Sequence, residues 1–415
     1  MDCSVWTREW VCRAAASPRH FAAIALVAIL AAFVALAPVR AQASSPGDLN
    51  IQLNAESEFD DTLSSASPEE QEFMRENYWR MRGYAPYFNQ ALPWAPPSHF
   101  YKDLYAIYRS EPDDQALLSA HPDWVLRDAQ GNKLYIQFDC NGTTCTQYAA
   151  DVGNPAWRAH WIDDAKSTLA LGYTGIFVDD VNMEMKVSNG AGDFVRPIDP
   201  RTGQPMTDES WRRYVAEFTE QIRAALPDAE IVHNSLWWMD RSDPYVQRQV
   251  AAADYIDLER GFADTGIVGG TGEWSYENYL SYVEWLHSQG AGAVYEPYDL
   301  DDQSRLFEMA SYFLVSNGND SISSEYETEP GDWWSGWATD LGDATTGRRE
   351  WKGLLRRDFA GGMVLVSEPE ADTTTVKLPR RVWTDPNGER VRRRVSLGER
   401  TGLVLIRGPK LGPRK

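Results

Sequence analysis

The stretch Gly172-Tyr-Thr-Gly-Ile-Phe-Val-Asp-Asp180 decides the fold class of this 415-residue chain. An amphipathic helical pattern over residues 155–171 ends at its first glycine, a short apolar run predicts a buried strand, and two acids follow. Where strands and helices alternate, the carboxyl ends of the parallel strands form the functional edge of the sheet. Successive strand residues point to opposite faces, so we expect only one of Asp179 and Asp180 to face a ligand.

This strand–helix unit recurs along the chain. Further helical patterns cover residues 209–226, 276–289 and 305–316. Strands are predicted at Tyr84–Phe88, Leu104–Tyr108, Leu134–Ile136, Gly175–Val178, Ala229–Asn234, Tyr255–Leu258, Gly292–Tyr295 and Ser321–Ser323. About eight such units predict an α/β fold, a closed (β/α)8 (TIM) barrel over residues 76–355. A doubly wound open sheet is the competing fold, but the chain has no G-x-G-x-x-G or P-loop motif for a nucleotide.

The two ends of the chain differ in character from the barrel. Alternating apolar residues with a turn at Asp385-Pro-Asn-Gly388 predict a small antiparallel β-sandwich domain over residues 356–408. Residues 1–43 resemble a signal peptide, with arginines before an apolar run at Phe21–Ala37 and small residues after it. An uncleaved membrane anchor is the alternative. Residues 44–75 are polar and are expected to form a linker.

A signal peptide implies a secreted or periplasmic protein, in which Cys140 and Cys145 are expected to form a disulfide. The net charge of -21 argues against nucleic acid as a partner, because an acidic surface repels phosphates. The 17 tryptophans exceed what a core needs, and flat apolar rings with one N–H group suit the faces of sugars. We expect a carbohydrate substrate and a monomer.

Polar residues end four of the predicted strands: Asp179, Asn234, Glu259 and Glu296. Hydrolysis of a glycosidic bond needs two carboxyl groups, one as nucleophile or base and one as acid. Four such strand ends in register with the strand–helix repeat therefore predict a carbohydrate site. Asp179 and Glu259 fit the fourth and sixth strands, while Glu296 is a second candidate for the acid.

Other chemistries fit the chain less well. No G-x-S-x-G elbow is present for a serine hydrolase, and no two of the six histidines lie three to five residues apart as metal ligands. We therefore expect no metal and no cofactor. A catalytically silent glycan-binding protein on the same barrel remains an alternative, and a metal-dependent polysaccharide deacetylase a weaker one.

The chain resembles the hypothetical glycosyl hydrolase family 15 over residues of about 75 to 408. The stretches that carry this resemblance are Asp151-Val-Gly-Asn-Pro-Ala-Trp-Arg158, Gly175-Ile-Phe-Val-Asp179 and Arg357–Val366. The resemblance, which extends to α-amylase- and α-galactosidase-like barrels, implies a glycosidase in which Asp179 is the nucleophile. Because the fifth strand ends in Asn234, the resemblance favours Glu259 on the sixth strand as the proton donor. We expect retention of configuration, with inversion as the alternative that a wider separation of the two carboxyl groups would favour.

Further residues near the strand ends are candidates for binding the sugar. His233 fits a buried structural role equally well. The candidates are Tyr87, Asp151, His233, Trp237, Trp238, Trp274 and Trp333, with Asp180, Asn234 and Glu296 as catalytic or binding residues.

Overall fold

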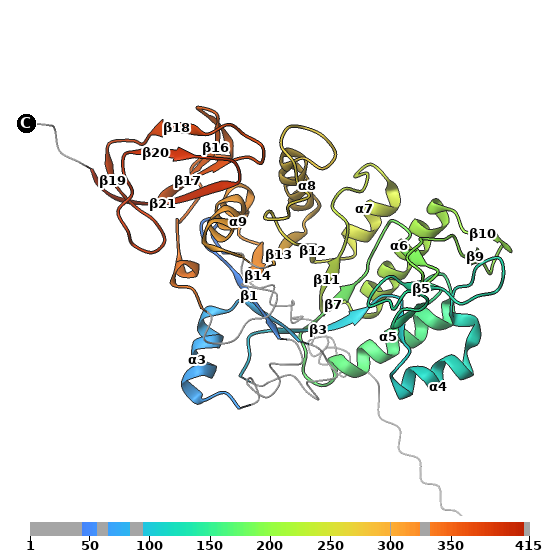
Figure 1. Ribbon diagram of the computed structural model, residues 1–415. Helices are drawn as coiled ribbons and strands as arrows, with labels where there is room; N and C mark the ends of the chain where they lie inside the picture. Colours follow the sequence, from blue (N-terminus) through green and yellow to red (C-terminus); the bar gives the residue numbers. More distant parts are fainter. Residues whose placement is uncertain (1–43, 56–64, 84–93, 299, 324–332, 411–415) are drawn as a thin grey trace, which may run out of the picture. The chain divides into compact units, whose positions relative to one another are not determined.

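Eight parallel strands close into a barrel in the computed structural model, which describes residues 44–55, 65–83, 94–298, 300–323 and 333–410 (Figure 1). The strands are β1 (Ile51–Ala55), β2 (Arg80–Gly83), β3 (Ser98–Asp103), β7 (Gly175–Asp179), β11 (Glu230–Asn234), β12 (Tyr255–Glu259), β13 (Gly292–Glu296) and β14 (Ser321–Ser323). Their order around the barrel follows the chain, and β1 closes the circle by pairing with both β2 and β14. The predicted (β/α)8 barrel is confirmed.

The first three barrel strands differ from the sequence-based expectation. The segment expected to be a linker contains β1, in which Ile51 and Leu53 are buried in the main apolar core. Gln52 and Asn54, on the opposite face of the strand, are also buried. A strand that is polar on its inner face reads as a polar segment, which explains the error.

The same reason applies to the third strand, which is β3 and not Leu104–Tyr108. That segment and Leu134–Ile136 instead contribute β4 (Ala106–Tyr108) and β5 (Tyr135–Ile136) to a separate small sheet. The predicted strand Tyr84–Phe88 lies outside the described residues.

Charged groups fill part of the barrel interior. Arg80 and His99 both contact the carboxylate of Glu230, at 2.7 and 3.0 Å. Burial alone would raise the pKa of Glu230, but the hydrogen bonds from His99 and Arg80 outweigh it and lower the pKa to about 2. This end of the barrel is therefore held together by an ionic cluster.

Helices cover the outside of the barrel (Figure 1). They are α3 (Pro68–Asn77), α4 (Pro112–Ala120), α5 (Pro155–Leu169), α6 (Asp208–Ala225), α7 (Pro244–Ala251), α8 (Tyr276–Gln289) and α9 (Asp302–Val315). The four helical patterns read from the sequence correspond to α5, α6, α8 and α9. Asn154 caps α5 through hydrogen bonds from two backbone N–H groups, which explains the Asn-Pro pair at its start.

A small antiparallel sheet forms beside the carboxyl ends of β3 and β7. Its strand order is β4-β6-β5-β8, with β6 at Gln147–Ala149 and β8 at Val187–Ser188. The loop between β5 and β6 is closed by the predicted disulfide between Cys140 and Cys145. A separate antiparallel hairpin pairs β9 (Ile198–Asp199) with β10 (Gln204–Pro205).

The C-terminal part is antiparallel. Five strands form one sheet, in the order β15 (Arg349–Trp351), β16 (Leu354–Asp358), β17 (Gly362–Ser367), β21 (Thr401–Lys410) and β19 (Arg381–Thr384), while β18 (Thr374–Lys377) pairs with β20 (Arg394–Leu397). A separate apolar cluster that includes Met363 and Trp383 packs within this part. The sheet begins at Arg349, seven residues before the predicted boundary. The sequence did not indicate the edge strand β15, because this strand is largely exposed and lacks an apolar face.

The sheet also packs on the barrel. β21 approaches α9 at Gly402, where a Cβ atom would lie 2.4 Å from the backbone oxygen of Leu306. Within the described part of the chain, no helix is both long and apolar enough to span a membrane. The apolar run Phe21–Ala37 lies outside that part.

Candidate active site

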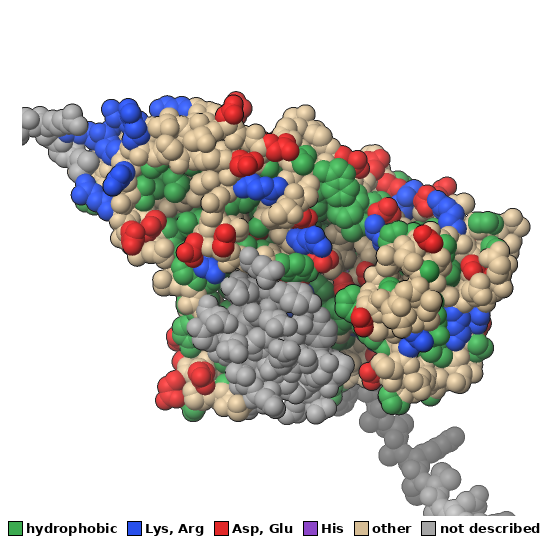
Figure 2. Space-filling view, viewed as in Figure 1, with side chains coloured by type: hydrophobic (Ala, Val, Ile, Leu, Met, Phe, Trp, Pro, Cys, Tyr) green, Lys and Arg blue, Asp and Glu red, His purple; other side chains and the backbone are tan. Residues whose placement is uncertain are grey.

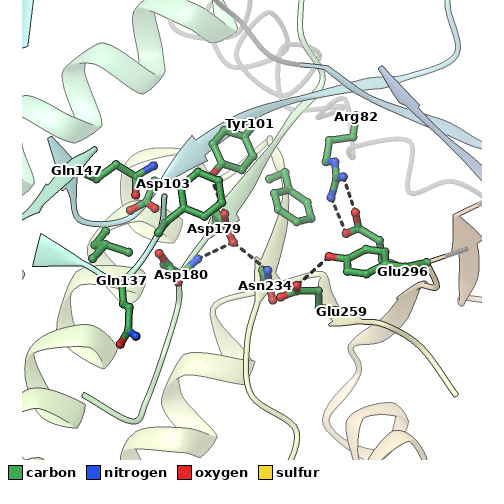
Figure 3. Close-up of a pocket in the computed structure, with 14 residues that line it drawn as sticks. Arg82, Tyr101, Asp103, Gln137, Gln147, Asp179, Asp180, Asn234, Glu259 and Glu296 are labelled. Atoms are coloured by element: carbon green, nitrogen blue, oxygen red, sulfur yellow. Dashed lines mark hydrogen bonds and ion pairs between the residues drawn. The ribbon is translucent and has the colours of Figure 1, made fainter. Parts of the chain in front are cut away.

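A cavity of about 250 Å³ opens at the carboxyl ends of the barrel strands (Figure 3). Carboxylates, amides and aromatic rings share its wall, and the predicted pair Asp179 and Glu259 lines it together. The lining residues are Arg82, Tyr101, Asp103, Ile136, Gln137, Phe138, Gln147, Phe177, Asp179, Asp180, Asn234, Glu259, Glu296 and Tyr298. The strand ends that the sequence singled out therefore meet at one cavity.

Asp179 lies at the centre of the labelled residues in Figure 3 and is fixed by three donors. Its Oδ1 accepts hydrogen bonds from Asn234 Nδ2 and from the backbone N–H of Asp180, both at 2.8 Å. Its Oδ2 accepts one from the hydroxyl of Tyr101 at 2.5 Å. Three donors stabilise a negative charge on this carboxylate and set its direction.

Glu259 is more exposed than Asp179, and within the described part of the chain its hydrogen-bond partner is Tyr298. The hydroxyl of Tyr298 donates to Glu259 Oε1 at 2.7 Å. Burial and the neighbouring carboxylates of Glu296 and Glu259 raise the pKa of Tyr298 well above its usual value, so the hydroxyl keeps its proton. Glu259 is thus a carboxyl group within reach of solvent, with one oxygen held by a permanent donor.

Glu296 also lines the cavity but is engaged differently. Arg82 donates to both of its carboxylate oxygens at 2.6 Å, and both side chains are nearly fully buried (Figure 3). The guanidinium group also lies over the ring of Phe177, 4.6 Å from its centroid. A carboxylate bound in this bidentate way serves to compensate a buried cation.

Two further carboxyl groups, of Asp103 and Asp180, line the cavity beside Asp179. Burial and the charge of Asp179 raise the pKa of Asp103 to about 7, although backbone N–H groups of Tyr105 and Ala106 donate to it at 2.7 Å. Burial and the two neighbouring acids raise the pKa of Asp180 strongly as well. The two carboxyl groups are hydrogen-bond partners, so the pair retains a proton at neutral pH.

The expectation that only one of the two adjacent acids would face the site is wrong, because both Asp179 and Asp180 line the cavity. Strand alternation does not apply to Asp180, which lies beyond the end of β7. Asp180 leaves the strand with a φ of 55°, a left-handed conformation that Asp tolerates better than most residues. It turns its carboxyl group toward Asp103 and the amide of Asn182, which donates to it at 2.7 Å.

Several lining residues were missed by the sequence reading. Arg82 lies on β2, where two arginines alternate with Met81 and Gly83, and this alternation was the signal that could have found it. Tyr101 and Asp103 lie on β3, which lacks such a pattern because Ser98 and Lys102 share the outer face with Phe100. The small sheet adds another group of lining residues: Ile136, Gln137, Phe138 and Gln147. The sequence carries no comparable signal that these residues fold toward the cavity.

Two predicted binding residues are structural. Asp151 is buried and accepts two hydrogen bonds from Arg201, at 2.9 and 3.0 Å, and does not line the cavity. His233 is fully buried on the outer face of β11, with its Nδ1 3.0 Å from Gln249 Nε2. Burial and the charge of Arg223 lower the pKa of His233 to about 3, so its ring is neutral. His233 points away from the cavity because it alternates along β11 with inward residues. Asp151 follows the end of β6.

The four predicted tryptophans do not line the cavity either. Trp237, Trp238 and Trp274 pack against one another with ring centroids 4.5–5.9 Å apart. Hydrophobic side chains reach the surface near α7 and α8 (Figure 2), and Trp274 is 42% exposed. Trp333 packs edge-on against Phe73 and Tyr78. Tyr87 lies outside the described residues.

Within the described ranges, no group of three or more His, Cys, Asp or Glu side chains could hold a metal ion. The acids of the cavity are instead partnered by protein donors and by one another.

The loop after Glu259 is held by a buried acid. Glu308 on α9 is fully buried, and its Oε2 accepts a hydrogen bond from the backbone N–H of Ala263 at 2.8 Å. A Cβ at Gly261 would lie 2.5 Å from Glu308 Oε1, so only glycine fits there. Burial raises the pKa of Glu308 to about 8.

We expect the stability of the protein to depend on pH through Glu308. Because the pKa is raised on folding, the unfolded chain loses this proton near pH 4.5 and the folded protein only near pH 8, so stability falls between these values. Gln does not ionise, so the free energy of unfolding of E308Q should not fall in this way. The difference in free energy of unfolding between E308Q and wild type is expected to increase by roughly 2 kcal/mol or more from pH 5 to pH 9. Chemical unfolding at both pH values measures this, with the exposed E76Q as control. An equal difference at both pH values would contradict it.

A closed barrel with paired carboxyl groups in a cavity at the strand ends defines a protein of the glycoside hydrolase barrel type. The chain belongs to the family described as hypothetical glycosyl hydrolase family 15, whose model matches residues 98–363, more than half of its length. A search of curated proteins finds no match.

Three solved structures to which the chain is similar are described as glycoside hydrolases. The glycoside hydrolase domain of PelA from Pseudomonas aeruginosa matches with a TM-score of 0.41 and 15% identity, covering 67% of this chain and 95% of that one. The maltogenic α-amylase AmyB from Thermotoga neapolitana matches with a TM-score of 0.48 and 12% identity, covering 86% of this chain and 98% of that one. The α-galactosidase TtGalA from Thermus thermophilus matches with a TM-score of 0.44 and 13% identity, covering 75% of this chain and 65% of that one.

Proposed function

We propose that this protein is an exported glycoside hydrolase that cleaves a poly- or oligosaccharide with Asp179 as nucleophile and Glu259 as acid and base. The observation that carries the proposal is the fixed carboxylate of Asp179, held by three donors, in the same cavity as the accessible Glu259. A catalytically silent glycan-binding protein would have no need for such a pair.

The two carboxyl groups suit different steps of a retaining reaction. The carboxylate of Asp179 attacks the anomeric carbon as Glu259 passes its proton to the leaving oxygen, which gives a glycosyl ester on Asp179. Glu259 then takes a proton from water, and the water oxygen attacks the anomeric carbon and releases Asp179. The Tyr298 hydroxyl holds Glu259 through Oε1 and leaves its Oε2 for the proton.

Export is part of the proposal. It is supported by the arginines and apolar run of the first 43 residues and by the Cys140–Cys145 disulfide, which belongs to an oxidising compartment. The mass of the protein recovered from outside the cytoplasm tests whether this segment is removed.

The test of the function combines product analysis with a change at Glu259. Wild-type protein is incubated with a panel of polysaccharides, and products are identified by mass spectrometry. E259Q is expected to lose about a hundredfold or more in kcat on the cleaved polysaccharide. On a 2,4-dinitrophenyl glycoside of the same sugar, whose leaving group needs no proton, formation of the glycosyl ester is expected to be nearly normal.

E273Q, at an exposed glutamate outside the cavity, is the matched control. Equal loss on both substrates would remove Glu259 from the role of acid. The absence of any product from wild-type protein across the panel would favour the silent glycan-binding alternative.

A further inference from the structure

Phe138 is the most exposed large apolar side chain of the described residues, at 62%, and it lines the cavity. Single exposed apolar residues are ordinary on a protein surface. Its position at a cavity whose other walls are mainly carboxylates and amides is what distinguishes it. An apolar ring there can cover the C–H face of a sugar while the polar groups bind its hydroxyls.

The backbone fixes where this ring lies. Phe138 follows β5, and its N–H donates to the backbone oxygen of Ile136 at 2.9 Å. Asp139 turns the chain sharply with a φ of 44°. The disulfide then ties the exposed Cys140 to Cys145, which is buried and begins the return toward β6. The loop is thus anchored on both sides of the ring by the small sheet and by a covalent bond.

The order of elements around the barrel places Phe138 relative to the two carboxyl groups. β5 belongs to the connection after β3, and the barrel order then runs through β7 with Asp179 and β11 to β12 with Glu259. Figure 3 shows the neighbouring Gln137 on one side of Asp179 and Glu259 on the other. The loop that carries Phe138 therefore reaches the cavity from the β3 side, across Asp179 from the proposed acid, which protonates the leaving group.

We propose that Phe138 is the aromatic platform of a sugar-binding subsite on the non-leaving side of the cleaved bond. The Cys140–Cys145 disulfide holds this platform in place. The proposal rests on the proposed function for the naming of the two sides, but the stacking itself is a binding property. In this proposal, the loop between β5 and β6 helps to select substrates by the number of sugar residues on the non-leaving side of the cleaved bond.

The test measures binding separately from turnover. Calorimetric titrations use maltohexaose, cellohexaose, mannohexaose and N-acetylchitohexaose as probes, each with a D179N background so that no probe is consumed. F138A is expected to weaken binding of the best probe by about tenfold or more, and F138W to restore it. The matched control is F194A, because Phe194 is 55% exposed and pairs with Ser188 of β8 in the small sheet but does not line the cavity.

The disulfide is tested with C140S/C145S, which is expected to weaken binding of the same probe while the barrel unfolds at an unchanged denaturant concentration. Unchanged binding in F138A, equal losses in F138A and F194A, or no binding of any probe would overturn the platform. Binding that depends on Phe138 without hydrolysis by wild-type protein would instead overturn the proposed function and leave the subsite standing.

A kinetic readout tests the side of the cavity. With 4-nitrophenyl glycosides of the cleaved sugar that carry one, two or three residues, F138A is expected to leave the shortest substrate unaffected and to raise KM for the longer ones. An equal rise in KM for all three substrates, which share the 4-nitrophenyl leaving group, would place the ring on the leaving-group side and overturn that part.

Discussion

Replacing Asp179 by asparagine is expected to lower kcat by at least about a thousandfold while the protein stays folded. An amide cannot form the glycosyl ester, and its N–H₂ group is a poor match for a site built of donors. The hydroxyl of Tyr101, the amide of Asn234 and the N–H of Asp180 all point at this carboxyl group. Steady-state rates on the cleaved polysaccharide and on the dinitrophenyl glycoside measure the loss, which is expected on both.

Two controls accompany this variant. D193N changes an exposed acid outside the cavity and is expected to keep wild-type rates. Azide added to D179A is expected to restore turnover on the dinitrophenyl glycoside and to give a glycosyl azide of inverted configuration, because azide takes the place of the missing nucleophile. A D179N enzyme that keeps more than a tenth of the wild-type rate would rule out Asp179 as the nucleophile.

The second large effect concerns stability and lies at Arg82. R82M is expected to lower the free energy of unfolding by about 3–5 kcal/mol, since it leaves the carboxylate of Glu296 buried without its cation. Asp257 worsens this, because it is also fully buried and neither of its carboxyl oxygens has a hydrogen-bond partner among the residues that the structure describes. Burial and the charge of Glu296 already raise the pKa of Asp257 well above its usual value. Denaturant unfolding monitored by tryptophan fluorescence measures the change.

The double variant R82M/E296Q separates charge from packing. Because it removes both charges, it is expected to recover most of the lost stability. The exposed pair of Arg75 and Glu72 provides the control, and R75M is expected to cost less than about 1 kcal/mol. If R82M proved as stable as wild type, Glu296 would no longer be explained as a counter-ion, and its role as a second candidate acid would reopen.

The sequence predicted the second half of the barrel well and the first half poorly. β7, β11, β12 and β13 were found because their apolar residues form runs, and each ends in a polar residue that reaches the cavity. β1 and β3 were missed because every second residue in them is a polar side chain that faces the barrel interior. In these strands a polar residue is therefore not a sign of exposure to solvent. Hydrophobic periodicity detects strands buried against apolar neighbours on both faces.

The site was predictable only where chemistry followed a strand end. Asp179 and Glu259 could be chosen from position alone, whereas Tyr101, Tyr298 and Phe138 depend on how strands and loops converge in space. The tryptophans were chosen by the same criterion of position after a strand end, but they do not line the cavity. Trp237 follows a strand end in sequence, but its ring turns away to pack on Tyr279 of α8, with centroids 4.9 Å apart. Sequence distance from a strand end does not determine which way a loop folds.

The pairing of β1 with β14 has a consequence for biosynthesis. Ile51 lies beside Ile322, so the ring of strands cannot close until the ribosome has passed Ile322, more than three-quarters of the way along these 415 residues. Until then β1 and the most recently made strand each present unpaired backbone N–H and C=O groups, the feature that promotes misassembly between chains. A nascent chain with such late closure is expected to depend on chaperones that shield these edges.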